Sequence, residues 1–231
     1  MLRLENLNVY YGESHVLYDI DLEVSGGQIV CLLGRNGVGK TTLLKGVIGL
    51  LPARAGKVYF DSQDVTPLPP NQRAKRGIGL VPQGREIFPF LTVHENLLLG
   101  LEARNDKLLT VPEEIYELFP ALKTMLGRKG GDLSGGLQQQ LAIGRALAMN
   151  PKLLLLDEPT EGIQPSVIFE IENAIQRIKE RGNIAILMVE QYLEFAWRVA
   201  DYYYIMAKGS VVSKGPTRGT DIEIVKEHII V

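Results

Sequence analysis

A glycine-rich segment near the start of the chain has the residue types and the spacing that bind phosphate groups. It fits the pattern G-x-x-x-x-G-K-[ST] and reads Gly34-Arg35-Asn36-Gly37-Val38-Gly39-Lys40-Thr41. The apolar run Ile29–Leu33 precedes it and a segment with helical spacing follows, a context that makes a chance match the weaker interpretation. Glycines let the backbone wrap closely around an anion, so that N–H groups and a helix N-terminus face it.

The end of this segment carries two side chains with distinct expected roles. Lys40 would reach the β- and γ-phosphates of a nucleoside triphosphate, and the Thr41 hydroxyl would ligate Mg²⁺. The predicted phosphate-binding residues run from Gly34 through Thr42. By itself the pattern indicates only that a nucleoside triphosphate binds.

Two adjacent carboxylates, Asp157 and Glu158, follow the apolar run Leu153–Leu156. Parallel α/β sheets bind ligands at the carboxyl ends of their strands, which is where these side chains would lie. Asp157 is then the expected partner of the Mg²⁺ ion, and Glu158 is placed to polarise the attacking water. The alternative is structural, with Asp157 capping a turn and Glu158 solvated, but the phosphate-binding segment favours the chemical interpretation.

A third segment narrows the class of nucleotide-binding protein. It lies between the other two, precedes a segment with helical spacing, and reads Leu133-Ser134-Gly135-Gly136-Leu137-Gln138. In this order the three segments resemble those of ABC-type ATPases, whose signature reads L-S-G-G-Q. The resemblance implies that Ser134, Gly135 and Gly136 bind the γ-phosphate of an ATP molecule held by a second ATPase subunit. A serine hydroxyl and glycine amides at a helix N-terminus suit that role, although alone the segment would be interpreted as a helix cap.

Further positions match the same family across essentially the whole chain. Tyr11, which precedes a glycine, resembles the aromatic residue that stacks on adenine, and Val16 lies nearby in sequence. Gln83 resembles the glutamine that touches Mg²⁺ and moves with the transport partner. The next residues, Gly84–Phe90, resemble the groove that receives the coupling helix of a membrane subunit. The apolar side chains of that stretch are equally consistent with the core of a helical lobe.

Three positions depart from the family pattern. Leu137 stands where the signature has glutamine, and Gln164 stands where the loop after the acidic strand has aspartate. Gln191 replaces the histidine that commonly follows the strand matching Ile184–Val189. A glutamine amide can donate a hydrogen bond to the γ-phosphate, but it exchanges no proton near neutral pH. Gln191 is therefore a candidate catalytic residue beside Glu158. Either Glu158 carries the catalysis with less help, or one of the two sites shared between the paired subunits works harder.

The spacing of the apolar residues predicts an α/β fold. Largely alternating residues indicate strands from Leu2 to Val24, and a capping box at Thr92 begins a helical region that extends to Leu126. Further strands are expected at Ile29–Leu33, Lys57–Phe60, Ile78–Val81, Leu153–Leu156, Ile184–Val189 and Tyr202–Met206, and helices at Lys40–Leu51, Leu137–Met149, Pro165–Arg181 and Leu193–Ala200. After Lys208 we expect a hairpin and a short helix.

The family resemblance turns these elements into a specific expectation for the fold. It implies a P-loop NTPase of the ABC type, with a mixed central sheet and an N-terminal antiparallel β subdomain. We expect a single ATPase domain over residues 1–231. Its ATP-binding α/β core would comprise residues 1–91 and 151–231, and its helical signature lobe would comprise residues 92–150.

The bulk composition argues against several other classes of protein. The 231 residues include 25 basic and 27 acidic ones, a formal charge of −2, so nothing in the charge indicates nucleic-acid binding. No stretch approaches the roughly 20 apolar residues that span a bilayer, and the charged N-terminus does not resemble a signal peptide. The single cysteine, Cys31, rules out an internal disulfide and is expected to be buried in its apolar run. Any membrane role is expected to come through a partner.

Short stretches resemble one branch of the family more than the others. The residues Val189–Gln191, V-E-Q, resemble the second ATPase of branched-chain amino acid and amide importers. The runs E-P-T-E-G-I-Q-P and P-Q-G-R-E-I-F-P most resemble the ATPase of the urea-type branch. This resemblance implies a peripheral protein on the cytoplasmic face of the inner membrane. Its partners would be a second ATPase subunit (a different chain, or a second copy), transmembrane permease subunits and, indirectly, a solute-binding protein.

Other functions stay open at this stage. A branched-chain amino acid fits the resemblance as well as urea does, because nothing in this chain is expected to touch the solute. A soluble ABC-type ATPase acting on ribosomes or DNA is a second class, but such proteins usually carry twin cassettes or long coiled-coil insertions. A binding-only nucleotide switch is a third class, suggested by Gln191 and Gln164 and opposed by Glu158.

Overall fold

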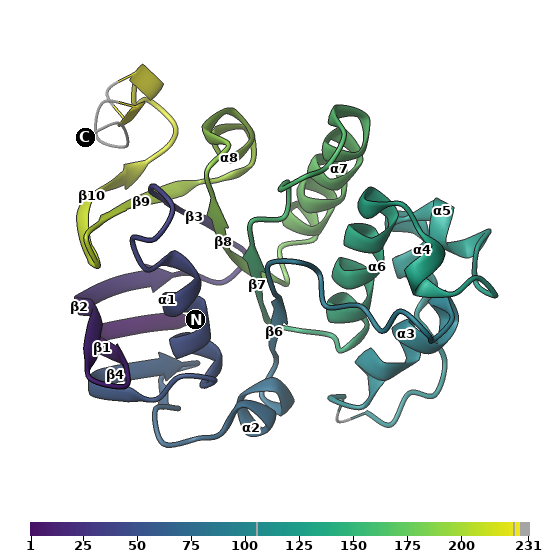
Figure 1. Ribbon diagram of the computed structural model, residues 1–231, viewed down its shortest axis with the longest axis horizontal. Coiled ribbons are helices and arrows are strands. Elements are labelled where there is room, and N and C mark those ends of the chain that lie inside the picture. The colour runs from purple at the N-terminus through teal and green to yellow at the C-terminus, as the bar shows by residue number, and fades with distance from the viewer. Residues whose placement is uncertain (105, 224, 227–231) are drawn as a thin grey trace.

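The computed structural model describes residues 1–104, 106–223 and 225–226, and its strands form two sheets (Figure 1). The smaller sheet is antiparallel, with the order β2-β1-β4-β5. Its strands are β1 (Leu2–Tyr11), β2 (Ser14–Val24), β4 (Ala53–Phe60) and β5 (Gln63–Asp64). The larger sheet has the order β10-β9-β3-β8-β7-β6 and is parallel except for β10. Its strands are β3 (Ile29–Leu33), β6 (Ile78–Val81), β7 (Leu153–Asp157), β8 (Ala185–Glu190), β9 (Tyr202–Ala207) and β10 (Ser210–Pro216). The predicted mixed sheet and N-terminal antiparallel sheet are both confirmed.

The central strands are apolar throughout because both of their faces are covered. In β3, Ile29, Cys31 and Leu33 pack into one core cluster, whereas Val30 and Leu32 pack into the other. Parallel strands that are buried on both faces have near-continuous apolar sequences, which is the pattern seen here. The expected burial of Cys31 is confirmed, and that burial raises the pKa of its thiol.

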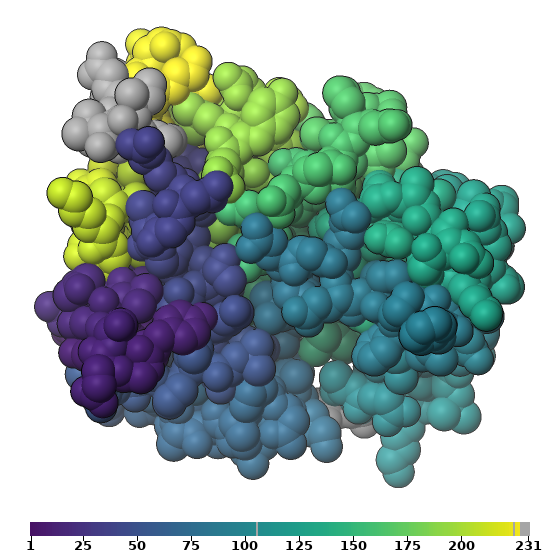
Figure 2. Space-filling view, viewed as in Figure 1, coloured from purple at the N-terminus to yellow at the C-terminus, as the bar shows by residue number. Residues whose placement is uncertain are grey.

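The helices pack on both faces of the larger sheet. They are α1 (Lys40–Ile48), α2 (Pro70–Lys75), α3 (Val93–Leu101), α4 (Glu113–Leu118), α5 (Pro120–Lys123), α6 (Gly135–Ala148), α7 (Pro165–Arg181) and α8 (Leu193–Val199). The apolar side of α1 shares one core with residues of both sheets, and α6, α7 and α8 share the other. Figure 2 shows the teal lobe that contains α3 to α6 at the opposite end of the molecule from the purple strands of the antiparallel sheet, β1 and β2. None of the helices within the described ranges is long and apolar enough to cross a membrane.

The helix after the phosphate loop is shorter than predicted. It was expected to reach Leu51, but α1 ends at Ile48 and Gly49 adopts a left-handed φ of 85°. The Arg73 guanidinium closes this end by donating hydrogen bonds to the carbonyl oxygens of Gly46 and Val47 at 2.9 and 2.7 Å. A Cβ atom at Gly49 would lie 2.9 Å from that guanidinium, so the helix terminus depends on glycine.

The helical lobe is also more broken than the sequence predicted. The Thr92 capping box is confirmed, since the Glu95 N–H donates to the Thr92 hydroxyl and the Glu95 carboxylate accepts from the Thr92 N–H. However, α3 ends at Leu101, and α4 and α5 begin only after Pro112 and at Pro120. Proline suits the first turn of a helix and cannot donate within one, so these prolines divide the region.

The hairpin expected after Lys208 begins earlier, because β10 pairs with β9, the strand before Lys208, and the turn lies at Lys208 and Gly209. The short helix expected after it falls partly on residues 224 and 227–231, which lie outside the described residues.

Candidate active site

The glycine-rich loop connects β3 to α1 and lines a cavity of about 300 Å³. Gly34 and Gly39 have φ values of 154° and 107° and touch neighbouring segments closely. A Cβ atom at Gly34 would lie 2.5 Å from the Met206 carbonyl oxygen, and one at Gly39 would lie 2.7 Å from Leu17. The fold therefore requires glycine at both positions. The cavity is lined by Val16, Asn36, Gly37, Gly39, Lys40, Thr41, Thr42, Gln83 and Glu158.

All of these lining residues are predicted site residues from four separate parts of the sequence, so the structure brings most of the predicted site together. Val16 lies in the lining. Tyr11 lies outside the lining, and its side chain is 45% exposed on the hairpin that joins β1 to β2.

The Lys40 ammonium group lies buried under the loop. It donates hydrogen bonds to the carbonyl oxygens of Gly34 and Arg35 at 2.8 and 3.0 Å. Its Nζ atom is 3.7 Å from Oε1 of Glu158. Burial lowers the pKa of Lys40, while the carboxylates of Glu158 and Asp157 oppose that shift. The arrangement places a cation at the base of the cavity, where phosphate oxygens would be met.

Thr41 and Asp157 form the pair that suits a divalent cation. The Thr41 hydroxyl donates to Oδ1 of Asp157 at 3.1 Å, and Asp157 ends β7 with 3% of its surface exposed. Burial raises the pKa of this carboxyl group, and the hydrogen bond from Thr41 opposes the shift. Hydroxyl and carboxylate oxygens are the hard ligands that Mg²⁺ prefers, together with water and substrate phosphate. Within the described ranges no cluster of three or more histidine, cysteine or acidic residues could hold a metal ion.

The Glu158 carboxylate is held by amide groups from two different loops. The Gln191 side chain donates to its Oε1 atom at 2.7 Å, and the Gln83 side chain donates to its Oε2 atom at 3.4 Å. Gln83 also donates to the Glu161 carboxylate at 3.0 Å. Glu158 has a left-handed φ of 48°, and its N–H donates to the Val189 carbonyl oxygen at 2.9 Å. Strained backbone of this kind clusters at functional sites, and here it accompanies a carboxylate that faces the phosphate loop.

The predicted signature residues lie apart from this cavity. Ser134 is the N-cap of α6 and accepts a hydrogen bond from the Leu137 N–H at 3.5 Å. A Cβ atom at Gly136 would lie 2.7 Å from Val167 of α7, so the close packing of these helices requires glycine there. Leu137, where the family has glutamine, packs against the core that α6 and α7 share. Ser134 is exposed, and neither it nor the two glycines that begin α6 line the cavity at the chain's own phosphate loop.

The apolar side chains after Gln83 were expected either to form a groove for a membrane subunit or to pack in the core of the helical lobe, and the structure shows some exposed and some buried. Ile87 packs against the core, whereas Phe88 and Phe90 are 50% and 84% exposed. Sequence reasoning missed Asn96, whose buried side-chain amide donates to the carbonyl oxygens of Phe88, Leu91 and Thr92 and accepts from the Phe88 N–H. The signal that could have identified Asn96 is a polar residue at a position of α3 whose helical spacing predicts burial.

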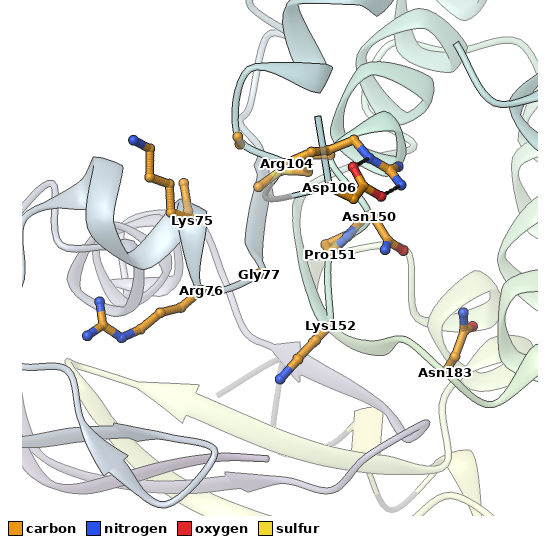
Figure 3. Close-up of a pocket in the computed structure, with 12 residues that line it drawn as sticks. Lys75, Arg76, Gly77, Arg104, Asp106, Asn150, Pro151, Lys152 and Asn183 are labelled. Carbon is orange, nitrogen blue, oxygen red and sulfur yellow. Dashed lines mark hydrogen bonds and ion pairs between the residues drawn. The ribbon is translucent and has the colours of Figure 1, made fainter. Parts of the chain in front are cut away.

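A second cavity, of about 350 Å³, lies at the amino-terminal ends of β6 and β7 in the large sheet. It is lined by Gly77 and Lys152, which precede these two strands. It contains several basic residues, but Arg104 is paired with Asp106. In Figure 3 the side chains of Lys75 and Arg76 point away from that pair. Ligands of parallel sheets bind at the carboxyl ends of the strands, so the cavity at the phosphate loop is the candidate active site.

The phosphate loop, the Thr41–Asp157 pair and the Glu158 carboxylate at the end of β7 define a P-loop nucleoside triphosphatase. Residues 17–161 match the family model described as ABC transporter. The chain belongs to the ABC transporter family, as one of its ATP-binding subunits. It binds ATP with Mg²⁺ and hydrolyses ATP in a cycle coupled to transport, in which such subunits dimerise and work with transmembrane permease subunits.

Several relatives are similar over almost their whole length. The high-affinity branched-chain amino acid transport ATP-binding protein BraG of Pseudomonas aeruginosa is 39% identical over 213 residues, which are 92% of this chain and 91% of BraG. The probable branched-chain amino acid transport ATP-binding protein LivF of Archaeoglobus fulgidus is 36% identical, with 93% and 92% covered. The lipopolysaccharide export system ATP-binding protein LptB of Escherichia coli is also 36% identical, with 99% and 94% covered.

Solved structures of ATP-binding cassettes share the fold. A nucleotide-free cassette from an ABC transporter has a TM-score of 0.81 and 31% identity, covering 100% of this chain and 94% of its own. A dimeric cassette in a post-hydrolysis state with ADP and Pi has a TM-score of 0.85 and 27% identity, covering 95% of this chain and 100% of its own. The predicted ABC-type fold is therefore confirmed.

Proposed function

We propose that this chain powers an ABC importer of a small solute, that the solute is urea, and that the chain works at the cytoplasmic face of the inner membrane. The observation that carries the catalytic part of the proposal is the hydrogen-bonded contact of Glu158 with Gln191 and Gln83 beside the phosphate loop. The choice of urea rests on the runs P-Q-G-R-E-I-F-P and E-P-T-E-G-I-Q-P.

In this proposal each residue of the site has one task during hydrolysis. The loop backbone from Gly34 to Gly39 and the Lys40 ammonium group bind the phosphates. Thr41, Gln83 and Asp157 hold Mg²⁺, which when bound neutralises charge on the β- and γ-phosphates. The Glu158 carboxylate orients the attacking water and accepts its hydrogen bond, and general-base assistance of this kind contributes about 10²–10⁴-fold.

The two remaining contacts with ATP come from the ends of the molecule. Tyr11 and Val16 would border the adenine, with the exposed Tyr11 ring as the stacking surface. Ser134, Gly135 and Gly136 would bind the γ-phosphate of ATP on a second ATPase subunit, because Ser134 is exposed at the N-terminus of α6 and helix N-termini suit anions. We propose that this second subunit is a different chain, with a second copy of this chain as the alternative.

The surface for the membrane subunits is proposed to lie at Phe88 and Phe90. These exposed rings lie on a loop fixed to the lobe by the buried Asn96 amide, and the Arg145 guanidinium lies 5.3 Å from the centre of the Phe88 ring. An apolar surface on a rigid support suits an amphipathic helix of a permease subunit. In this proposal one ATPase domain spans residues 1–231, with an ATP-binding core of 1–91 and 151–231 and a helical signature lobe of 92–150. A solute-binding protein would act only through the permease.

The solute is tested by uptake in cells that lack this chain, with labelled urea and labelled leucine measured in parallel. The proposal expects loss of urea uptake, retention of leucine uptake, and recovery when the parent chain is supplied. The Lys40→Ala variant is the matched control, because it should fold but not restore uptake. Retention of urea uptake would rule out urea as the solute.

Branched-chain amino acid import is the second candidate, favoured by the likeness to BraG and LivF. It expects the opposite result, with leucine uptake lost and urea uptake retained. The likeness to LptB, an export-system protein, makes the direction of transport part of the proposal. If neither uptake changed, recovery of the chain through an affinity tag would decide between membrane subunits and the nucleic acid expected of a soluble ABC-type ATPase.

A further inference from the structure

The Glu190 carboxylate accepts hydrogen bonds from two loops of the active site and so connects them. It is the last residue of β8, and 2% of its surface is exposed. Its Oε1 atom accepts from the N–H and the hydroxyl of Thr160 at 3.1 and 2.8 Å. Its Oε2 atom accepts from the N–H groups of Gln191 and Tyr192 at 3.0 and 3.2 Å. One oxygen therefore holds one loop and the other oxygen holds the other.

Each of the two loops carries one partner of the contact between Glu158 and Gln191. Thr160 lies two residues after Glu158, and 7% of its surface is exposed. Gln191 follows Glu190 directly and donates to Glu158 at 2.7 Å. The Glu190 carboxylate thus fixes the backbone on both sides of the shortest hydrogen bond made to the proposed catalytic carboxylate.

A buried carboxylate is a costly way to join two loops. Removing a charge from water is unfavourable unless hydrogen bonds replace the lost hydration, and well-packed apolar residues are often at least as stable. Burial raises the pKa of Glu190, and the hydrogen bonds from Thr160, Gln191 and Tyr192 oppose that shift. A glutamine here could not reproduce the arrangement, because it offers one acceptor oxygen where four donors converge.

We infer that Glu190, with Thr160, is a positioning residue for ATP hydrolysis, which sets the placement of Gln191 against Glu158. This inference rests on the proposed catalytic role of Glu158. Glu190 is absent from the lining of the cavity at the phosphate loop, although it borders an adjoining cavity with Glu158 and Gln191. Both of its oxygens already accept hydrogen bonds from the chain, so Glu190 acts through Glu158 and Gln191. Its loss should slow the hydrolysis step and leave ATP binding intact.

The test compares variants in the complex recovered through an affinity tag on the full chain. Glu190→Gln removes the charge, Thr160→Val removes one donor, and Thr160→Ser retains that donor. Thr217→Val is the matched control, since Thr217 is 6% exposed and its hydroxyl donates to the Ala200 carbonyl oxygen at 2.6 Å, in a different part of the chain. The readouts are kcat and KM for ATP, ATP affinity by calorimetry, and the melting temperature.

We expect Glu190→Gln to lower kcat by about tenfold or more, since misplacement of a reacting group by roughly 1 Å can cost about 10²-fold. Thr160→Val should lower kcat by a smaller factor, and Thr160→Ser should restore it. KM and ATP affinity should change less than about twofold in all of them. Parental kcat in both Glu190→Gln and Thr160→Val would overturn the inference. The inference would also be overturned if kcat fell only in proportion to the loss of melting temperature, and Thr217→Val with a similar loss of melting temperature showed the same fall in kcat.

Glu158→Gln, alone and combined with Glu190→Gln, separates this inference from the function on which it rests. If Glu158→Gln hydrolyses ATP at the parental rate, the proposed catalytic carboxylate is wrong. If Glu158→Gln is slow while Glu190→Gln and Thr160→Val are parental, only the positioning role is wrong. The double variant should be no slower than Glu158→Gln, because residues that act as one unit are non-additive; a further large fall would also contradict the inference.

Discussion

The side-chain amide of Gln191 donates a hydrogen bond to the Glu158 carboxylate across 2.7 Å. The position at which the family pattern has a histidine is therefore in direct contact with the proposed catalytic base. Glutamine has a fixed protonation state, whereas an unperturbed histidine titrates with a pKa of about 6.5. The departure from the pattern keeps a donor beside Glu158 and removes a titrating group.

Replacing Gln191 with histidine should give hydrolysis a pH dependence that the parent lacks. We expect kcat of Gln191→His to show an added step near the pKa of histidine, at about 6 to 7, that is absent from the parent profile. Gln191→Ala, which removes the donor altogether, should lower kcat by roughly tenfold, because a hydrogen bond to a charged group contributes about 1.5–3 kcal/mol. The measurement is kcat from pH 5.5 to 8.5; identical profiles for parent and histidine variant would contradict the role given to this position.

The Glu158→Gln variant should bind ATP with parental affinity and hydrolyse it at least about 10²-fold more slowly, since it cannot act as a base. ATP-bound dimers with the partner ATPase should therefore accumulate. Phosphate release and size-exclusion chromatography with ATP measure the two effects. Glu180→Gln, which alters an exposed carboxylate of α7, serves as the control and should hydrolyse ATP like the parent.

The Lys40→Ala variant should lose ATP affinity itself. Its ammonium group lies in the lining of the phosphate cavity, so its removal should weaken ATP binding by about tenfold to a hundredfold, the equivalent of 1.5–3 kcal/mol. Calorimetric titration with ATP measures this, with Lys45→Ala as a control on the same helix. Unchanged affinity in Lys40→Ala would contradict the predicted contact with phosphate.

Arg73 should contribute more to folding than any exposed arginine. Its buried guanidinium donates to four carbonyl oxygens, those of Gly46, Val47, Thr66 and Leu68. We expect Arg73→Met to lower the free energy of unfolding by about 3 kcal/mol or more, since buried acceptors without donors cost about 1–3 kcal/mol each. Urea denaturation measures it, and the exposed neighbour variant Arg76→Met should change stability by less than about 0.5 kcal/mol. Equal effects in the two variants would refute the capping role.

Glu190 should also change how the free energy of unfolding depends on pH. Its pKa in the folded chain is raised above the ordinary value of 4.5, mainly by burial, so folding strengthens its hold on a proton. The stabilising contribution is complete below pH 4.5 and is lost as the pH rises through the raised pKa. The free energy of unfolding of the parent minus that of Glu190→Gln should therefore fall with rising pH above 4.5. A difference that stays constant or increases with pH would show that the pKa is not raised.

Much of the fold could be predicted because its signals are local. The helix predicted at Pro165–Arg181 matches α7 at both ends, since Pro165 suits the first turn and Gly182 closes the helix with a φ of 69°. The strand at Ile29–Leu33 is likewise exact, because its apolar run is bounded by turn residues. The end of α1 could not be predicted, because Arg73, which closes it, is 26 residues from Val47.

The sequence by itself determined the chemical class. Glycines, Lys40 and Thr41 lie within eight residues of one another, and Asp157 and Glu158 are adjacent, so short-range patterns carry the phosphate and metal chemistry. Only the tertiary structure decided how the groups meet. Gln191 reaches Glu158 over 33 residues and Glu190 reaches Thr160 over 30, because β7 and β8 are neighbours in the sheet and end at the same edge. Strand pairing sets such contacts, and no local spacing of residue types encodes them.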